Sequence, residues 1–216
     1  MENLSLIQKI VVWALPVLFA ITVHEVAHGW VANLFGDKTA KLSGRLTLNP
    51  IKHIDLVGTI IVPIMMLLVS NFIFGWAKPV PVDARNLRNP RYNMIAVAAA
   101  GPISNLLMAF LWAGVAKLGM SIESSYFSVP MVLMGWAGIQ INIVLCVLNL
   151  LPIPPLDGSR VVGNLLPPRM AYSYSKIEPY GFFILILLML TNVLNAILTP
   201  PIYFLFNFIS NLIGLN

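Results

Sequence analysis

The sequence predicts an all-α polytopic membrane protein: a core of three transmembrane helices plus a re-entrant segment and C-terminal helices, with small β-hairpin or sheet elements at the cytoplasmic side. One observation is composition, because 58% of the 216 residues are hydrophobic and 10% are charged, whereas soluble domains average about 45–50% and about 25%. The other is a set of five apolar runs, each long enough to cross a bilayer as a helix of about 20 residues. The runs cover residues 10–35, 54–74, 94–115, 129–151 and 180–213.

The same composition excludes several classes of protein. Abundant Leu, Ile, Val and Phe exclude intrinsic disorder, and a single cysteine, Cys146, excludes a disulfide scaffold. The length predicts one membrane-embedded domain over residues 1–216, with a core at about 7–160 and C-terminal helices at about 175–214. The net charge of +5 comes from scattered Lys and Arg residues. That pattern favours basic cytoplasmic loops, and no nucleic acid is expected as a partner.

The first run is expected to be a helix of the mature protein. It follows Lys9 as the apolar part of a signal sequence would, but no small-residue cleavage site comes after it. His24, Glu25 and His28 lie inside it. A charged side chain at the centre of a membrane helix costs about 2.5–3.5 kcal/mol, so these residues need a functional reason.

Two polar stretches between the runs are expected to be β-like. Residues 36–48 alternate polar and apolar side chains around Gly44, which predicts a short β-hairpin. Residues 74–89 contain Pro79 and Pro81, which predict an extended segment that is unpaired on one edge. Both elements are expected at a membrane surface.

The last run is expected to contain a break. Pro200 and Pro201 interrupt its apolar sequence, and a proline removes a helical hydrogen bond and clashes with the preceding turn. Residues 180–213 therefore form either two helices or one spanning helix followed by a short interfacial one.

The spacing of His24, Glu25 and His28 predicts a metal site. On a helix the two imidazoles lie one turn apart on the same face, and Glu25 lies about 100° round the helix, within reach of a metal-bound water. This is the HExxH pattern of zinc metalloenzymes, in which the glutamate is the general base. With three His and four Glu in the chain, chance gives the pattern about once in a thousand sequences. The alternative, two buried histidines that satisfy each other, leaves an unpaired carboxylate in the apolar phase.

A catalytic zinc site has three protein ligands, so a third must come from elsewhere in the chain. Asp157 is the strongest candidate, because it lies in residues 149–160, where three prolines forbid regular helix and Gly158 lets the backbone turn. Irregular backbone at membrane depth persists only where it is buried in protein or lines a cavity. The alternative is that Asp157 is a solvated turn residue.

Five motifs give the chain a specific resemblance. In chain order they are His24-Glu25-Val-Ala-His28, Asn49-Pro50-Ile-Lys-His53-Ile-Asp55, Phe74-Gly75-Trp76-Ala77-Lys78-Pro79-Val80-Pro81-Val82, Gly101-Pro102-Ile-Ser-Asn105 and Leu156-Asp157-Gly158. Over residues 11–160 the chain resembles the site-2 protease family of intramembrane zinc metalloproteases, in its compact prokaryotic form without PDZ or CBS domains.

The resemblance implies a function and a set of site residues. It implies a zinc endopeptidase with one Zn²⁺ per chain, which hydrolyses peptide bonds within or near transmembrane segments of membrane proteins. Its partners would be a transmembrane protein substrate and the lipid bilayer. By this resemblance His24, His28 and Asp157 bind zinc and Glu25 activates water. Asn105 is expected near the site as a polar contact for substrate or oxyanion.

The substrate contacts are less specific. A membrane helix hides its peptide bonds in its own hydrogen bonds, so a substrate must unwind before it is cut. Residues 76–82 and the hairpin at 36–48 are candidates for pairing with the unwound chain through main-chain hydrogen bonds. Pro79 and Pro81 fit a rigid connector equally well. His53 either contacts substrate or water near the metal or bonds to a neighbouring loop.

A shared metal ion constrains the topology. If His24, His28 and Asp157 meet, three full crossings between them would put Asp157 on the opposite side of the membrane. One apolar run must therefore be re-entrant or lie at the surface. Residues 54–74 are the best candidate, because a glycine and a proline interrupt their first half and polar loops flank both ends.

The distribution of positive charge favours the same arrangement. With residues 54–74 re-entrant, 11 of the 13 Lys and Arg residues fall on one side, and Lys9 and Lys117 fall on the other. With that run crossing, the split is 8 against 5. By the positive-inside rule, the N-terminus is expected outside the cell membrane and the site is expected to open toward the cytoplasm.

Other functions are compatible with the same residues. A membrane metal transporter or metal-binding sensor would use the same His/Asp site, but it would not need Glu25 as a base. An inactive relative is disfavoured, because every expected ligand type is present. Two imidazoles and a carboxylate suit zinc, although iron or cobalt could occupy them.

Overall fold

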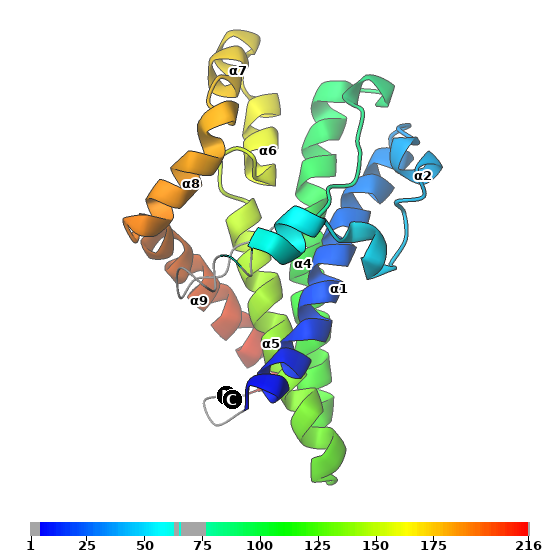
Figure 1. Cartoon of the computed structure of the whole chain (residues 1–216), viewed down its shortest axis with the longest axis vertical. Helices are drawn as coiled ribbons and strands as arrows, with labels where there is room; N and C mark the ends of the chain where they lie inside the picture. The colour runs from blue at the N-terminus through cyan, green and yellow to red at the C-terminus, as the bar shows by residue number, and fades with distance from the viewer. Residues whose placement is uncertain (1–4, 63–64, 66–76, 216) are drawn as a thin grey trace.

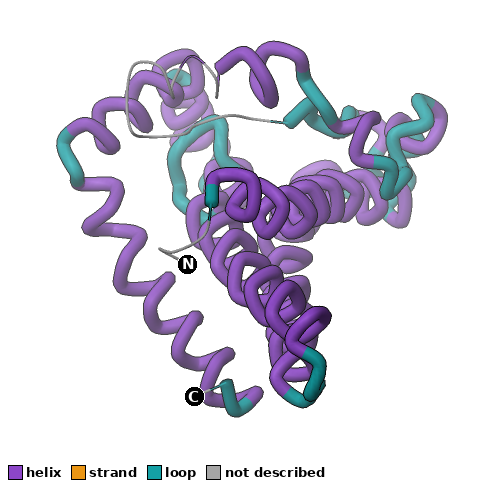
Figure 2. Tube along the Cα trace, turned by 60° about the horizontal axis from the view of Figure 1, so that its bottom comes forward, coloured by secondary structure: helices purple, strands orange, loops and turns teal. Residues whose placement is uncertain are grey.

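The computed structural model describes residues 5–62, 65 and 77–215. Within these residues every regular element is helical and no strand is formed (Figure 2). By length and composition, five of the described helical stretches could cross a membrane: α1 (Leu6–Leu34), α4 (Pro90–Met120), α5 (Ser125–Asn149), the stretch Pro168–Leu190 and α9 (Val193–Ile213). The predicted all-helical, multi-pass membrane fold is therefore confirmed in outline.

The core of the molecule is formed by α1, α4 and α5. α4 and α5 are neighbours joined by a short turn at residues 121–124, and α1 packs against both. Glycines of α5 make the close approach possible: a Cβ at Gly135 would lie 2.6 Å from the Cβ of Ala116, and one at Gly138 would overlap the ring of Trp112. Small residues at membrane helix contacts let backbones approach in this way.

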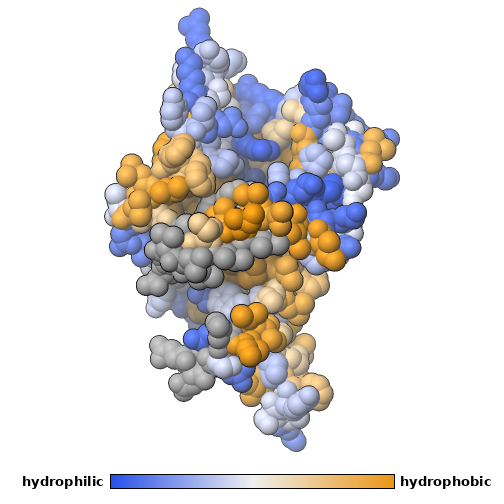
Figure 3. Space-filling view, viewed as in Figure 1, coloured by the Kyte–Doolittle hydropathy of each residue, from blue (hydrophilic) through white to orange (hydrophobic). Residues whose placement is uncertain are grey.

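The helices divide the molecule into two ends, which Figure 1 shows. α1 and α5 run in the same direction and α4 runs back, so the start of α1, the α4–α5 turn and the C-terminus lie toward one end. The other end carries α2 (Thr39–Leu42), α6 (Asp157–Leu165) and α7 (Pro168–Ser175). On the face drawn in Figure 3, hydrophilic residues gather mainly at this second end.

The C-terminal tract is broken at a different place from the predicted one. α8 (Gly181–Leu190) is followed by Asn192, whose left-handed conformation (φ 60°) turns the chain into α9. Asn tolerates this conformation better than most residues. Pro200 and Pro201 lie inside α9 and do not end it. Beyond them α9 packs on α5, with the rings of Phe206 and Trp136 5.4 Å apart, and this packing offsets the hydrogen bonds that the prolines remove.

The predicted β-hairpin at residues 36–48 is wrong. The segment contains the one-turn helix α2 and a series of turns. Gly44, interpreted as the hairpin turn, ends α2 with a φ of 65°, and the N–H groups of Gly44 and Arg45 donate to the carbonyls of Lys41 and Ala40. A glycine commonly terminates a helix in this way. The polar and apolar alternation therefore comes from a short helix in which Ala40 is buried.

The run that the sequence predicts to be re-entrant, residues 54–74, falls largely outside the described residues. Its described beginning is the π-helix η2 (Leu56–Ile61). The chain on either side of it is tied together: the Lys78 N–H donates to the His53 carbonyl, and the Arg88 N–H donates to the Phe35 carbonyl, each over 3.0 Å. The chain therefore begins α4 on the side where α1 ends. α4 and α5 then return it to that same side before α6.

Candidate metal centre

The C-terminal half of α1 carries the two predicted histidine ligands. α1 begins with a capping box, in which Ser5 and Gln8 each accept a hydrogen bond from the other's backbone N–H. Because His24 and His28 are one turn apart, their rings meet edge to face with centroids 4.7 Å apart. Their Nε2 atoms are separated by 3.1 Å.

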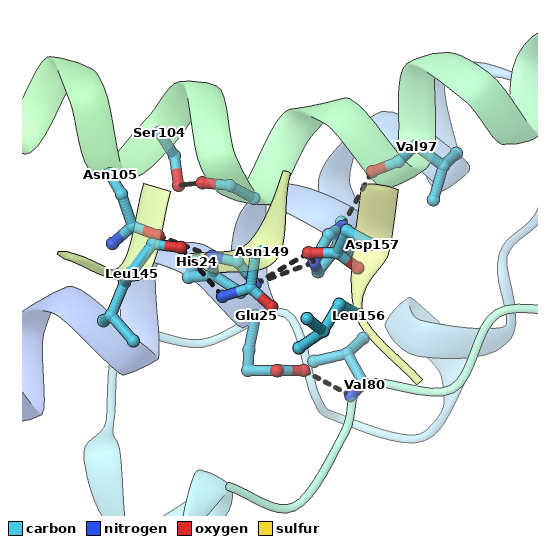
Figure 4. Close-up of polar contacts among 12 residues, drawn as sticks. His24, Glu25, Val80, Val97, Ser104, Asn105, Leu145, Asn149, Leu156 and Asp157 are labelled. Atoms are coloured by element: carbon cyan, nitrogen blue, oxygen red, sulfur yellow. Dashed lines mark hydrogen bonds and ion pairs between the residues drawn. The ribbon is translucent and has the colours of Figure 1, made fainter. Parts of the chain in front are cut away.

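Asp157 joins the histidines from the start of α6 (Figure 4). After α5, residues 150–156 form turns and bends, as the three prolines there predict. Gly158 is required because the chain passes close to its own backbone, and a Cβ at Gly158 would overlap the carbonyl of Leu150. Asp157 Oδ2 lies 3.2 Å from the Nε2 atoms of both histidines. The structure thus brings together the three residues that the sequence selects as metal ligands.

Oxygen acceptors determine which ring nitrogen of each histidine faces this cluster. His28 Nδ1 lies 2.7 Å from the carbonyl oxygen of Val97, and His24 Nδ1 lies 2.6 Å from Oδ1 of Asn105. These oxygens only accept hydrogen bonds, so each Nδ1 carries a ring proton and donates it. The Nε2 atoms of the neutral rings then present lone pairs, which is the form in which histidine binds a metal.

The cluster fits a zinc ion. Its three atoms, the two Nε2 and Asp157 Oδ2, are separated by 3.1, 3.2 and 3.2 Å, and tetrahedral zinc with bonds of about 2.0–2.1 Å would hold its ligands about 3.3–3.4 Å apart. Asp157 Oδ2 is buried and has no hydrogen-bond partner among the described residues. With both rings in the neutral form that binds metals, three lone pairs would face one another, and a divalent cation between them would relieve the repulsion and satisfy the buried carboxylate.

Gly101 of α4 shapes the site without being a ligand. A Cβ at this position would lie 2.5 Å from both His24 Cε1 and His28 Nε2. Only glycine therefore lets α4 approach closely enough for the Val97 carbonyl to reach His28. Sequence reasoning missed this role, and the available signal was a glycine directly before Pro102 inside an apolar run.

Replacing Gly101 with Ala is expected to weaken zinc binding. The added methyl group would force the rings to turn away from Asp157 or α4 to move away from α1. Such overpacking costs about 1–3 kcal/mol, which corresponds to a roughly 5–150-fold loss of affinity. Competition with a chelator measures this affinity, and Gly114→Ala is the matched control, because a Cβ at Gly114 of the same helix meets nothing within 4 Å. Equal zinc affinities of the two variants would contradict the prediction.

α4 also holds the helix that carries Asp157. The guanidinium group of Arg91, near the start of α4, donates to three carbonyls at the end of α6. They are those of Asn164 (2.7 Å), Leu165 (3.2 Å) and Leu166 (3.1 Å). One helix thus positions both the histidines and the element that supplies the carboxylate.

Glu25 lies beside the ligand cluster. Its Oε2 accepts a hydrogen bond of 2.7 Å from the backbone N–H of Val80 (Figure 4). This bond directs the carboxylate toward residues 77–83. We call this segment the strap.

The strap runs without helix or strand, as expected for an extended segment. The predicted extended segment covers residues 74–89, of which residues 74–76 lie outside the described residues. The prediction is wrong at Ala84–Asn86, which form the short 3-10 helix η3. Several elements hold the strap by its backbone. The strap backbone donates from Lys78 N–H to His53 O (3.0 Å), from Val80 N–H to Glu25 Oε2 (2.7 Å) and from Asp83 N–H to Asp37 Oδ2 (2.7 Å), and the Lys78 carbonyl accepts from Arg45 Nη2 (2.8 Å). The strap is therefore fixed beside Glu25 from both of its ends.

His53 lies outside the group of candidate metal ligands. It is buried, and its Nε2 lies 2.9 Å from the carbonyl oxygen of Thr47. Its own carbonyl accepts the Lys78 N–H. Of the two interpretations that the sequence leaves open, this position supports a histidine bonded to a neighbouring loop.

Asn105 lies behind His24, fully buried. Its Oδ1 accepts from His24, and its Nδ2 donates to the Ala20 carbonyl over 3.2 Å and to Asn142 Oδ1 over 2.9 Å. Both amide hydrogens are engaged, so none remains for a substrate or an oxyanion. The expected contact with substrate or oxyanion stays a prediction. The structure shows that Asn105 contacts His24, one of the candidate metal ligands, from behind.

Asp37 connects the end of α1 to the strap, and its replacement by Asn is expected to destabilise the protein. Burial raises the pKa of this carboxyl, but hydrogen bonds from Thr39, Asp83 and Asn86 outweigh burial and lower it. A lowered pKa stabilises the fold above the ordinary carboxyl pKa, and this stabilisation is lost as the pH falls through the lowered value. At pH 7 we expect Asp37→Asn to lose about 1–3 kcal/mol. The loss should shrink in acid, and thermal unfolding in detergent at both pH values measures it. An equal loss at both would contradict this account.

Comparison with known proteins agrees with the site. Residues 113–192 match the model of peptidase family M50. The chain is 41% identical to "Putative zinc metalloprotease YwhC" of Bacillus subtilis over 201 residues, which cover 91% of this chain and 87% of that protein. It is 29% and 26% identical to the proteins named "Putative zinc metalloprotease Rip2" of Mycolicibacterium smegmatis and Mycobacterium tuberculosis, over 88% of this chain and 71% of each relative. No solved structure matches the chain. The chain therefore belongs to peptidase family M50, the family of the site-2 proteases.

Proposed function

We propose that the chain is an intramembrane zinc endopeptidase that cuts transmembrane protein substrates within or near their membrane segments, as in regulated intramembrane proteolysis. In this proposal residues 1–216 form one membrane-embedded metalloprotease domain, and His24, His28 and Asp157 hold one Zn²⁺. The observation that carries the proposal is the convergence of two imidazole nitrogens and a buried carboxylate oxygen within 3.2 Å of one another. Glu25 follows His24 in the chain, and its carboxylate accepts the Val80 N–H.

Glu25 is the proposed general base. A bound zinc ion would supply Lewis-acid activation of water and of the peptide carbonyl. The Glu25 carboxylate accepts the proton of the attacking water and then delivers it to the leaving amine. The Val80 N–H, 2.7 Å from Oε2, keeps the carboxylate facing the strap while the proton is held.

The strap is the proposed docking segment for the unwound substrate. A helical substrate exposes no peptide bond until its own hydrogen bonds open. The strap lies next to Glu25 and is fixed by Arg45 and Asp37, so a chain segment paired along it would be presented to the base. This form of recognition adds a strand by main-chain pairing and accepts varied side chains.

The orientation we propose places the site toward the cytoplasm of the cell membrane. Eleven of the 13 Lys and Arg residues lie in segments on the side where α1 and α5 end and α4 begins. Lys9 and Lys117 lie at the opposite end, where the Lys117 ammonium donates to the Gly214 carbonyl over 2.7 Å. An excess of positive charge marks the cytoplasmic side of membrane proteins.

A purified-component assay tests the proposed function. The full chain in detergent or liposomes is mixed with a labelled transmembrane peptide, with and without a chelator. We expect cleavage that stops when the metal is removed and returns when zinc is restored. Cleavage that continues after complete metal removal would overturn the proposal. Zinc movement across liposomes without any cleavage would instead favour the metal transporter, which the relatives' names do not support.

A further inference from the structure

A chain of buried amide hydrogen bonds runs from His24 through α4 into α5. His24 Nδ1 donates to Asn105 Oδ1 (2.6 Å), Asn105 Nδ2 donates to Asn142 Oδ1 (2.9 Å), and Asn142 Nδ2 donates to the Gly138 carbonyl (2.9 Å). Both asparagine side chains are completely buried. A buried amide in an apolar helix is costly unless it is hydrogen-bonded. Asn142 has no role in the metal site as described above, so its presence in this hydrogen-bonded series needs a reason.

Backbone carbonyls give the chain a fixed direction. The Gly138 carbonyl only accepts, so the NH₂ group of Asn142 must face it and Asn142 Oδ1 must face α4. The NH₂ group of Asn105 then faces two acceptors, Asn142 Oδ1 and the Ala20 carbonyl. A rotation of the Asn105 amide by half a turn would place its oxygen next to these two oxygens, with no hydrogen atom to bond them. Asn105 Oδ1 is thereby directed at His24 Nδ1.

This direction decides the tautomer of His24. Facing an acceptor, Nδ1 must carry the proton, and Nε2 is left with the lone pair that points at Asp157. With the Asn105 amide reversed, Nδ1 would accept and Nε2 would carry the proton, which prevents ligation. His28 needs no such chain, because its Nδ1 donates directly to the Val97 carbonyl.

We propose that Asn142 is a positioning residue, which through Asn105 holds His24 in the tautomer that binds the metal. The proposal deepens the proposed function and rests on it for the identity of the ion. The proposed role of Asn142 is to accept a hydrogen bond from Asn105. A residue at position 142 that still accepts this hydrogen bond should therefore preserve zinc binding, even if it lowers the stability of α5.

Two substitutions separate this role from a structural one. Asn142→Leu removes the acceptor but suits an apolar helix, whereas Asn142→Asp keeps the acceptor and places an acid in the membrane. We expect Leu to weaken zinc binding by at least about tenfold, the range found for groups that orient metal ligands. We expect Asp to stay within about threefold of the unsubstituted chain, although it unfolds at a lower temperature than the Leu variant.

The experiment measures zinc affinity by chelator competition and unfolding temperature on the purified full chain. Cys146→Ala is the matched control, since Cys146 is buried one turn along α5 and outside the chain of amides. It is expected to keep its zinc affinity. If zinc affinity followed unfolding temperature across the three variants, the proposal would be overturned.

A spectroscopic measurement reads the tautomer itself. ¹⁵N NMR of the zinc-free chain labelled at histidine distinguishes a proton on Nδ1 from one on Nε2. We expect His24 to carry it on Nδ1, to lose this preference in Asn142→Leu and to keep it in Asn142→Asp, with His28 unchanged throughout. An unchanged His24 signal in Asn142→Leu overturns the proposal. This readout needs neither zinc nor cleavage, so an inactive chain would refute the proposed function and still test Asn142.

Discussion

Replacing Glu25 with Gln is expected to abolish peptide cleavage while one zinc ion stays bound per chain. Gln keeps the shape of the side chain and an oxygen that can accept the Val80 N–H, but it cannot take a proton from water. General-base catalysis contributes about 10²–10⁴-fold to the rate, so cleavage of a labelled transmembrane peptide should fall by that factor. Metal analysis of the same preparation should still give one zinc.

The control for this result is Glu178→Gln, which removes an exposed carboxylate outside the ligand set. It should cleave at the unsubstituted rate. A Glu25→Gln chain that cleaves normally would contradict the assignment of the base. Loss of zinc together with activity would show instead that Glu25 serves the metal site rather than the proton transfer.

Removing any one of the three proposed ligands is expected to remove the metal. His24→Ala, His28→Ala and Asp157→Ala each leave two protein ligands where a catalytic zinc site has three. Zinc content after dialysis against a weak chelator should fall from one ion per chain to nearly none, and cleavage should fall with it. The expected effect is large, because each of these residues supplies one of only three protein bonds to the ion.

The third histidine of the chain is the matched control for the ligand variants. His53→Gln keeps a side-chain N–H that can reach the Thr47 carbonyl and leaves the ligand set untouched. It should retain its zinc. If His53→Gln lost zinc as completely as His24→Ala, or if Asp157→Ala kept it, the proposed ligand set would be contradicted.

The sequence was sufficient to find the ligand cluster because chemistry and spacing coincide there. His24 and His28 are one turn apart in an apolar helix, and Asp157 follows three prolines that end the preceding helix. The structure brings these residues within 3.2 Å of one another. The parity of crossings expected from the sequence agrees with the described residues, in which two helices of membrane-spanning length, α4 and α5, lie between α1 and α6.

The support behind the ligands could not be predicted, because it depends on how helices pack. His28 is held by a backbone carbonyl, that of Val97, and any residue type supplies such a carbonyl. The need for glycine at position 101 arises only when α4 packs on α1, because a Cβ there would then clash with the two histidine rings. Asn142 carries a signal, an amide in an apolar helix, but its partner Asn105 is 37 residues away. The local sequence pattern also gave a wrong prediction at Gly44, because a glycine is equally suited to a hairpin turn and to the end of a helix.

X-ray absorption at the zinc edge tests the central claim most directly, because it reports the atoms that surround the metal in the loaded protein. The account predicts nitrogen and oxygen neighbours at about 2.0–2.2 Å, with the multiple scattering of two imidazole rings and no sulfur. It also predicts that any zinc still bound to the His24→Ala variant shows the scattering of one imidazole ring instead of two. A sulfur neighbour at about 2.3 Å, or an unchanged spectrum in His24→Ala, would place the ion elsewhere and contradict the account.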